Sequence, residues 1–245
     1  EGVLRYRSGK IRGILNGLDT ASWDPWSDPA LPANYHLGDM KGKKVCRKAL
    51  VEACGWEDSG GPVIVSVGRL VRQKGMELVL GALEELVALG ARLVVVGTGE
   101  RALEERFSAE SLGNPESLHF RGAFDEGFAR LAYAGGDIFV MPSLFEPCGL
   151  SQMIAMRYGT VPVVRAVGGL ADTVADADVV PAGTGFLFED PTPGALVEAV
   201  KRALAHLREP RTWARLRGRC MEKDFSWAPS ARSYMTLYGS LTDPS

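Results

Sequence analysis

Residues 138–158 read IFVMPSLFEPCGLSQMIAMRY, in which a continuous apolar run is followed by a polar turn and a helix-like segment. The apolar run, residues 138–141, is typical of a strand that is buried on both faces of a parallel sheet. The stretch SLFEPCGLSQ, residues 143–152, then places a glutamate, a proline, a cysteine and a glycine between strand and helix. This connection is either a plain linker or the place where the protein carries out its chemistry.

The same alternation of strand and helix extends to both sides of this stretch. Short runs rich in β-branched residues predict strands at residues 63–67, 92–96, 118–120, 137–141 and 161–164. Apolar stripes at helical spacing predict helices at residues 41–53, 73–89, 100–109, 125–134, 150–158, 193–207, 211–223 and 228–241. This alternation predicts an α/β fold with a Rossmann-like, doubly wound parallel sheet.

Turn signals such as Trp23-Asp24-Pro25 dominate the first part of the chain. We therefore expect residues 1–60 to form an interdomain or linker segment with one helix. Residues 61–190 are expected to form the Rossmann-like domain, and residues 191–245 to add C-terminal helices to the same domain.

Composition narrows the class of protein. The 245 residues include 28 Lys and Arg against 30 Asp and Glu, a net charge of -2, so charge gives no reason to expect nucleic acid or an anionic membrane as partner. No apolar run approaches the roughly 20 residues of a membrane span, and the first residues, EGVLRYRSGK, do not have the layout of a signal peptide. The scattered cysteines and histidines predict neither a disulfide framework nor a metal site, and a reducing, cytoplasmic compartment is expected.

Ligands of open α/β sheets bind beyond the carboxyl ends of the strands. The loops at these ends are residues 68–70, residues 97–99, the region of Phe124 and residues 143–152. In the first of these stretches, VGRLVRQKG (residues 67–75), Arg69 and Lys74 form either a solvated basic turn or a pair of cations that neutralises a polyphosphate. Neither a Walker A motif nor G-x-G-x-x-G is present, so neither NTPase nor dehydrogenase chemistry is indicated.

The loop of residues 143–152 has two interpretations as well. The amides of Gly149, Leu150 and Ser151 would open the next helix, where a phosphate or a polarised hydroxyl group can bind. Alternatively, Ser151 is only a helix cap and Glu146 is a charge that faces solvent.

Longer blocks of the chain resemble the C-terminal half of bacterial glycogen synthases and plant starch synthases. The blocks are GILNGLDTASWDP (residues 13–25), VGRLVRQKGMELVL (67–80), AGGDIFVMPSLFEPCGLSQMIAMRYGTVPVVRAVGGLADTV (134–174) and DFSWAPSARSYMTLY (224–238). The third block is the most specific. The resemblance implies a GT-B fold, in which this chain is the C-terminal, nucleotide-sugar-binding half of a retaining glucosyltransferase. Such an enzyme transfers glucose from ADP-glucose to the non-reducing end of an α-1,4-glucan.

The resemblance also implies partners and a compartment. The partners would be ADP-glucose, a glycogen or starch acceptor and an N-terminal GT-B domain that this chain lacks, with ADP as the product and no further cofactor or metal. The compartment would be the bacterial cytoplasm or the plastid stroma.

Position by position, the resemblance implies roles for single residues. Glu146, Arg69 and Lys74 are the catalytic candidates: Arg69 and Lys74 would hold the donor diphosphate, and Glu146 would lie beside the glucose hydroxyls. Further donor-binding candidates are Gly68, Gly97, Thr98, Phe124, Cys148, Gly149, Leu150 and Ser151. The backbone of residues 148–150 would hold the sugar, and Ser151 would lie near the distal phosphate.

Four positions are compared with the family individually. Asn16 and Asp19 match an Asn-Gly-x-Asp element at the interdomain cleft. Phe124 stands where a tyrosine often stacks on adenine, and Arg130 stands where a histidine is frequent. At these two positions, the sequence alone does not show which contacts the side chain makes.

Two other functions stay open. One is a related GT-B transferase that uses a UDP- or GDP-sugar, since Phe124 would stack on any base. The other is a non-catalytic nucleotide-sugar-binding module, because half of the active site is missing. A metal-dependent transferase is disfavoured, since the donor loops contain no Asp-x-Asp.

Overall fold

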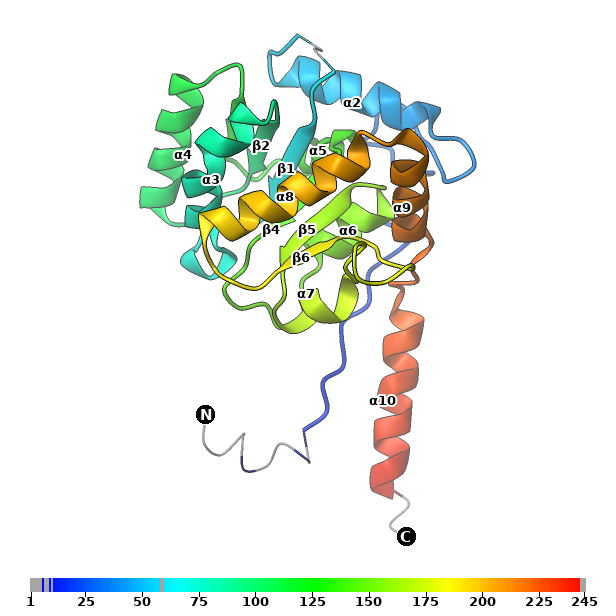
Figure 1. Ribbon diagram of the computed structural model, residues 1–245. Helices are drawn as coiled ribbons and strands as arrows, with labels where there is room; N and C mark the ends of the chain where they lie inside the picture. The colour runs from blue at the N-terminus through cyan, green and yellow to red at the C-terminus, as the bar shows by residue number, and fades with distance from the viewer. Residues whose placement is uncertain (1–5, 7–8, 10, 58–59, 243–245) are drawn as a thin grey trace.

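In a computed structural model, which describes residues 6, 9, 11–57 and 60–242, a parallel sheet forms the centre of the molecule (Figure 1). Its six strands lie in the order β3-β2-β1-β4-β5-β6. The strands are β1 (Val63–Val67), β2 (Arg92–Val96), β3 (Leu118–Arg121), β4 (Ile138–Met141), β5 (Val161–Arg165) and β6 (Phe186–Phe188). Because the strand order reverses between β1 and β4, a ligand-binding crevice is expected at the ends of these two strands.

Helices cover both faces of this sheet. They are α2 (Lys41–Ala53), α3 (Met76–Ala88), α4 (Arg101–Gly113), α5 (Glu126–Gly135), α6 (Ser151–Arg157), α7 (Gly168–Thr173), α8 (Pro193–Leu207) and α9 (Pro210–Glu222). One further helix, α10 (Trp227–Thr242), follows α9 and does not cover the sheet. Helix α3 packs against α8 on one face, whereas α5 and α6 pack together on the other (Figure 1). The predicted α/β fold with a doubly wound parallel sheet is therefore confirmed.

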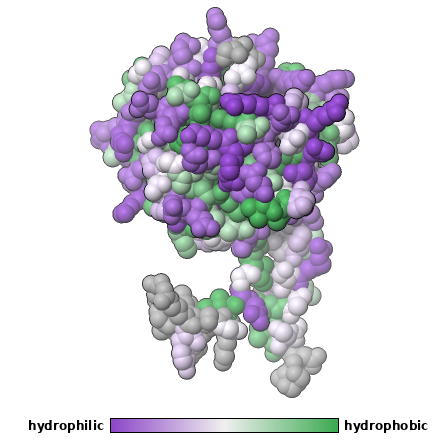
Figure 2. All heavy atoms as spheres, viewed as in Figure 1, coloured by the Kyte–Doolittle hydropathy of each residue, from purple (hydrophilic) through white to green (hydrophobic). Residues whose placement is uncertain are grey.

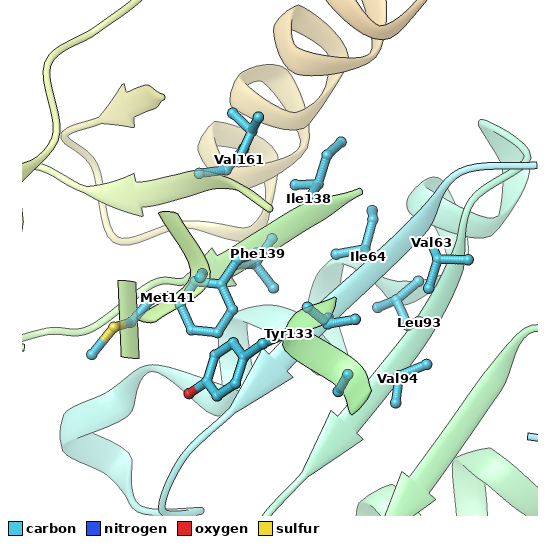
Figure 3. Packing of buried hydrophobic residues seen from close by; sticks show 14 of the residues in the cluster. Val63, Ile64, Leu93, Val94, Tyr133, Ile138, Phe139, Met141 and Val161 are labelled. Carbon is cyan, nitrogen blue, oxygen red and sulfur yellow. The ribbon is translucent and has the colours of Figure 1, made fainter. Parts of the chain in front are cut away.

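The core is the apolar interior of this sheet and its helices. Ile64 of β1 pairs with Leu93 of β2 on one side and with Ile138 of β4 on the other. Figure 3 shows these side chains together with Tyr133 of α5, whose ring lies 5.7 Å from that of Phe139 between centroids. Such dense packing on both faces is why the strands appear in the sequence as uninterrupted apolar runs.

Most of the predicted elements agree with the structure to within a few residues, and α2 and α8 agree at both ends. Local signals explain the sharp start of α8. The hydroxyl of Thr192 accepts a hydrogen bond from the amide of Ala195 at 3.2 Å, and Pro193 occupies the first turn. Such caps are short-range interactions, so the sequence displays them directly.

The predicted helix at residues 73–89 is wrong at its start. A separate 3-10 turn, η2 (Arg72–Lys74), precedes α3, and Gly75 between them is left-handed with φ of 67°. A Cβ atom at Gly75 would lie 2.0 Å from the carbonyl oxygen of Pro142. This close approach holds the turn that contains Lys74 against the end of β4 and keeps Lys74 off the helix.

Two elements were not predicted at all. Strand β6 has only three residues, and α7 begins with two glycines, which are poor helix formers. Helix α4 continues to Gly113, and α6 begins at Ser151, one residue later than expected. These errors arise where tertiary contacts outweigh local preference.

Helix α2 belongs to the same packed body, because its buried Cys46 and Leu50 lie in the common core and the helix packs against α5. Its Lys43 is buried as well. The ammonium group of Lys43 donates hydrogen bonds to the carbonyl oxygens of Ala134 and Tyr158 and to Oγ1 of Thr160, at 2.9, 3.0 and 2.9 Å. The division of the chain near residues 60 and 190 remains a prediction.

Helix α10 projects away from this body and runs beside the N-terminal segment (Figure 1). Ser230 donates a hydrogen bond to the carbonyl oxygen of Leu15 at 2.7 Å, which ties the two segments together. The projecting helix exposes large apolar side chains, among them Met235 and Leu241, each 72% exposed. Hydrophobic side chains are visible on the projecting part of the molecule in Figure 2. No described helix combines the length and the hydrophobicity that crossing a membrane requires.

Candidate donor-binding site

An open cavity of about 460 Å³ lies at the carboxyl ends of β1 and β2, beside the first turns of α5 and α6. Seven of the residues predicted from the sequence line it: Gly68, Arg69, Gly97, Thr98, Phe124, Leu150 and Ser151. Its exposed lining is mostly apolar. The cavity therefore suits a ligand with a flat apolar part and a charged end near Arg69.

The two glycine-containing loops touch each other at the cavity. The amide of Leu70 donates to the carbonyl oxygen of Thr98 at 2.9 Å, which pairs the loop after β1 with the loop after β2. Gly97 has φ of 148°, and a Cβ atom there would lie 1.9 Å from the carbonyl oxygen of Gly68. A glycine is thus required at Gly97 by contact between the loops, whether or not a ligand is bound.

A smaller hollow of about 20 Å³ adjoins the cavity and is lined by Arg69, Lys74 and Ser151 among others. Arg69 is exposed, and within the described residues its guanidinium group makes no ion pair. The side chain of Lys74 is 18% exposed and forms an ion pair with Glu146. The two cations therefore lie together but differ in their partners.

Glu146 is buried, with 6% of its surface exposed. The interpretation of Glu146 as a solvent-facing charge is therefore wrong. Its Oε2 atom accepts hydrogen bonds from the ammonium group of Lys74 and, at 3.2 Å, from the hydroxyl of Ser143. Its carbonyl oxygen accepts from the amide of Gly169 at 2.9 Å, so the residue is held at both backbone and side chain.

The loop around Glu146 is anchored by neighbouring elements. Gln73 donates to the carbonyl oxygen of Phe145 at 2.9 Å, and Arg165 donates to that of Leu144 at 3.1 Å. Gln152 donates to the carbonyl oxygens of Cys148 and Gly149 at 3.2 and 3.0 Å. These contacts tie the connection to η2, β5 and α6.

Ser151 is not the cap of α6, because Leu150 occupies that position and no side chain caps the helix. The interpretation of Ser151 as only a helix cap is therefore wrong. Cys148 and Gly149 lie in the loop but are not among the residues that line the cavity. Their backbone contacts to a sugar remain a prediction.

Asn16 and Asp19 lie outside the cavity. The carboxylate of Asp19 accepts hydrogen bonds from the amides of Ala21 and Ser22, both at 3.1 Å, which folds the local turn. The neighbouring Leu18 donates to the carbonyl oxygen of Phe225 at 2.6 Å, at the base of α10. The structure thus groups these residues with the N-terminal segment and α10, and their role at a cleft remains a prediction.

Nine residues that line the cavity were not predicted as site residues, among them Trp23, Tyr133 and Ile154. Tyr133 and Ile154 belong to apolar stripes of helices, so in the sequence they resemble ordinary core positions. Trp23 stands in the block of residues 13–25, but only the folded chain brings it to the wall of the cavity.

Arg130 holds Trp23 in place. Its guanidinium group stacks over the indole ring, 4.1 Å from the ring centroid. The same group forms an ion pair with the buried Asp28 at 3.0 Å and donates to the carbonyl oxygen of Ser22 at 2.7 Å. The arginine at this position therefore fastens the N-terminal segment to α5 and supports one wall of the cavity.

Residues 56–215 match the family described as Glycosyl transferases group 1, and the chain belongs to this family. Within it, the chain is a homologue of the C-terminal, donor-binding domain of glycogen synthases. It is 48% identical over 245 residues to the glycogen synthase of Anaeromyxobacter sp. (strain Fw109-5), covering 100% of this chain and 52% of that protein. It is 44% identical over 240 residues to the glycogen synthase of Syntrophotalea carbinolica, covering 97% of this chain and 50% of that protein.

Solved structures agree with this assignment. The catalytic domain of starch synthase IV from Arabidopsis thaliana, bound to ADP and acarbose, has a TM-score of 0.91 at 36% identity, over 97% of this chain and 50% of that one. Sucrose-phosphate synthase from Thermosynechococcus elongatus has a TM-score of 0.68 at 25% identity, over 98% of this chain and 56% of that one. The fold is thus that of the C-terminal GT-B domain, and the chain spans about half the length of the curated relatives it matches.

Proposed function

We propose that this chain is the donor-binding half of a retaining glucosyltransferase that moves glucose from ADP-glucose to the non-reducing end of an α-1,4-glucan. The observation that carries the proposal is the clustering of Arg69, Lys74 and Glu146 at the switch point, next to a largely apolar cavity. The likeness to a starch synthase bound to ADP and acarbose supports the same ligand classes.

The nucleoside would occupy the cavity between Phe124 and Trp23, with its diphosphate at Arg69 and Lys74. Loss of the diphosphate makes the anomeric carbon oxocarbenium-like and the leaving oxygens more negative. Fixed cations at these oxygens stabilise that transition state, because they need no reorganisation during the reaction. Glu146 would accept hydrogen bonds from glucose hydroxyls and orient the anomeric carbon, without forming a glycosyl-enzyme intermediate.

An N-terminal GT-B domain would supply the opposite wall of the active site and much of the acceptor surface. The apolar side chains on α10 and the adjoining N-terminal segment offer a surface for it. Closure of the two domains over the donor would exclude water from the reaction. The enzyme would work in the bacterial cytoplasm or the plastid stroma, where nucleotide sugars are made.

Titration calorimetry on the 245-residue chain tests the donor site. We expect ADP-glucose to bind more tightly than UDP-glucose or a GDP-sugar. Arg69→Ala should weaken binding of ADP about tenfold, and more at low salt, because an exposed charge is less screened there. Arg72→Ala is the matched control, since Arg72 lies in the same loop but does not line the cavity. Unchanged affinity in Arg69→Ala would contradict the diphosphate assignment.

The same assays separate the alternatives. Preference for UDP-glucose or a GDP-sugar would indicate a related GT-B transferase. Nucleotide-sugar binding without glucan elongation, even after an N-terminal GT-B domain is joined to the chain, would indicate a non-catalytic module.

Arg130→Lys is expected to weaken ADP binding about three- to tenfold and to leave binding of inorganic pyrophosphate unchanged. Lysine keeps the charge near Asp28 but lacks the planar group that stacks on Trp23, so the nucleoside wall loses its support. Calorimetry with both ligands measures the difference. Arg101→Lys, on the exposed face of α4, is the control. An equal loss for both ligands would argue against a role at the nucleoside end.

A further inference from the structure

The two residues assigned to different parts of the donor bind each other in this structure. Lys74 is assigned to the diphosphate and Glu146 to the sugar, yet their side chains form an ion pair. The side chains of Lys74 and Glu146 are only 18% and 7% exposed. Water therefore has little access to either charged group. Separating the pair is unfavourable unless both ions receive new partners.

The ion pair affects Arg69 and Lys74, the two cations of the site, differently. Arg69 makes no ion pair within the described residues, so a diphosphate can bind it without breaking a contact. Lys74 directs one of its three N–H groups at Glu146. The full charge and all donors of its ammonium group are therefore available to a diphosphate only when it leaves the carboxylate. The affinity of the site for a diphosphate thus depends on whether the carboxylate of Glu146 receives another partner in place of Lys74.

Free nucleoside diphosphate and its glucosyl ester differ in whether they supply a new partner for Glu146. With free nucleoside diphosphate, Lys74 either stays with Glu146 or leaves a buried carboxylate whose one remaining hydrogen bond among the described residues comes from the hydroxyl of Ser143. With the glucosyl ester, the diphosphate receives Lys74 while the sugar hydroxyls donate to Glu146. Only the sugar-loaded ligand satisfies both ions.

We infer that the Lys74–Glu146 ion pair makes the site discriminate between sugar-loaded nucleoside diphosphate and free nucleoside diphosphate, in favour of the former. This inference rests on the proposed function and adds a specificity determinant to it. After transfer, Glu146 recovers Lys74, which weakens the hold on the product ADP. The pair thus favours both donor capture and product release.

The discriminating variant is Glu146→Gln, titrated with ADP and with ADP-glucose. We expect it to bind ADP at least about fivefold more tightly than the unmodified chain, because Lys74 loses its competing partner and a negative charge leaves the phosphate site. The preference for ADP-glucose over ADP should shrink by more than this factor, since the sugar contact is lost as well. Unchanged or weaker ADP binding would overturn the inference.

Two matched variants exclude a general charge effect. Glu100 accepts a hydrogen bond from the amide of Arg72 at 3.0 Å, in the neighbouring loop, and Glu100→Gln removes a negative charge without touching Lys74. Its affinity for ADP should stay within about twofold of the unmodified chain. In a chain that already carries Lys74→Met, Glu146→Gln should increase the affinity for ADP much less than it does alone. An equal increase in both cases would show that the carboxylate merely repels the phosphates and would refute the ion-pair argument.

The unmodified chain provides a test that does not depend on folding of a variant. Because coupling between two ligands is reciprocal, glucose that occupies Glu146 should tighten the binding of ADP. Calorimetric titration with ADP in glucose, compared with the same concentration of mannitol, measures this. Absence of any gain would count against the inference. If the unmodified chain fails to bind ADP at all, the proposed function itself fails, whereas normal ADP binding without these effects refutes the inference alone.

Discussion

Glu146→Gln should reduce glucosyl transfer at least about a hundredfold in an enzyme that joins this chain to an N-terminal GT-B domain, because misplacing the reacting carbon by about 1 Å has an effect of this size. The glutamine amide keeps the shape of the carboxylate but accepts weaker hydrogen bonds from sugar hydroxyls and presents a donor in place of one acceptor. Incorporation of glucose from ADP-glucose into glycogen measures the loss.

The control for this prediction is Glu100→Gln, which should retain transfer. Gain of ADP affinity in Glu146→Gln would show that the variant is folded and that only the sugar-orienting function is lost. Transfer near the unmodified level would contradict the assignment of Glu146.

Lys43→Met should lower the free energy of unfolding by about 2–4 kcal/mol, because buried acceptors that lose their donor are costly. The ammonium group of Lys43 connects α2 to the carbonyl oxygens of Ala134 and Tyr158 and to the hydroxyl of Thr160. Urea denaturation measures the loss. Lys44→Met is the matched control, since the adjacent Lys44 is exposed and its replacement should change stability by less than about 0.5 kcal/mol.

The pH dependence of stability provides a second measurement on Lys43. Burial, assisted by the nearby positive charge of Arg217, lowers the pKa of Lys43 from 10.5 to about 7. Between this value and the unfolded pKa of about 10.4, the unfolded chain binds more protons, so the free energy of unfolding should rise with pH. Below pH 7 both states are protonated, and the group adds no slope. Lys43→Met should lack the rise, and identical pH profiles would contradict the shift.

Much of the fold could be predicted because its signals are local. The strand at residues 63–67, α2 and α8 depend on apolar runs, helical periodicity and caps, which the sequence displays directly. The helix predicted at residues 73–89 failed because the conformation of Gly75 depends on the carbonyl group of Pro142, far away in the sequence.

The site was predictable as a set of loops but not as a set of contacts. The rule that ligands bind beyond the strand ends correctly selected Arg69, Thr98 and Phe124 as cavity residues. The cavity wall formed by Trp23, and its support by Arg130, depend on segments more than a hundred residues apart.

The sequence by itself determined the alternation of strands and helices, the family blocks and the identity of the charged residues at the strand ends. Only the tertiary structure decided the strand order, which places the loops after β1 and β4 side by side at the switch point. The same arrangement buries Glu146 and pairs it with Lys74. The physical reason is that hydrophobic periodicity is encoded between near neighbours, whereas burial and ion pairing depend on which distant segments meet.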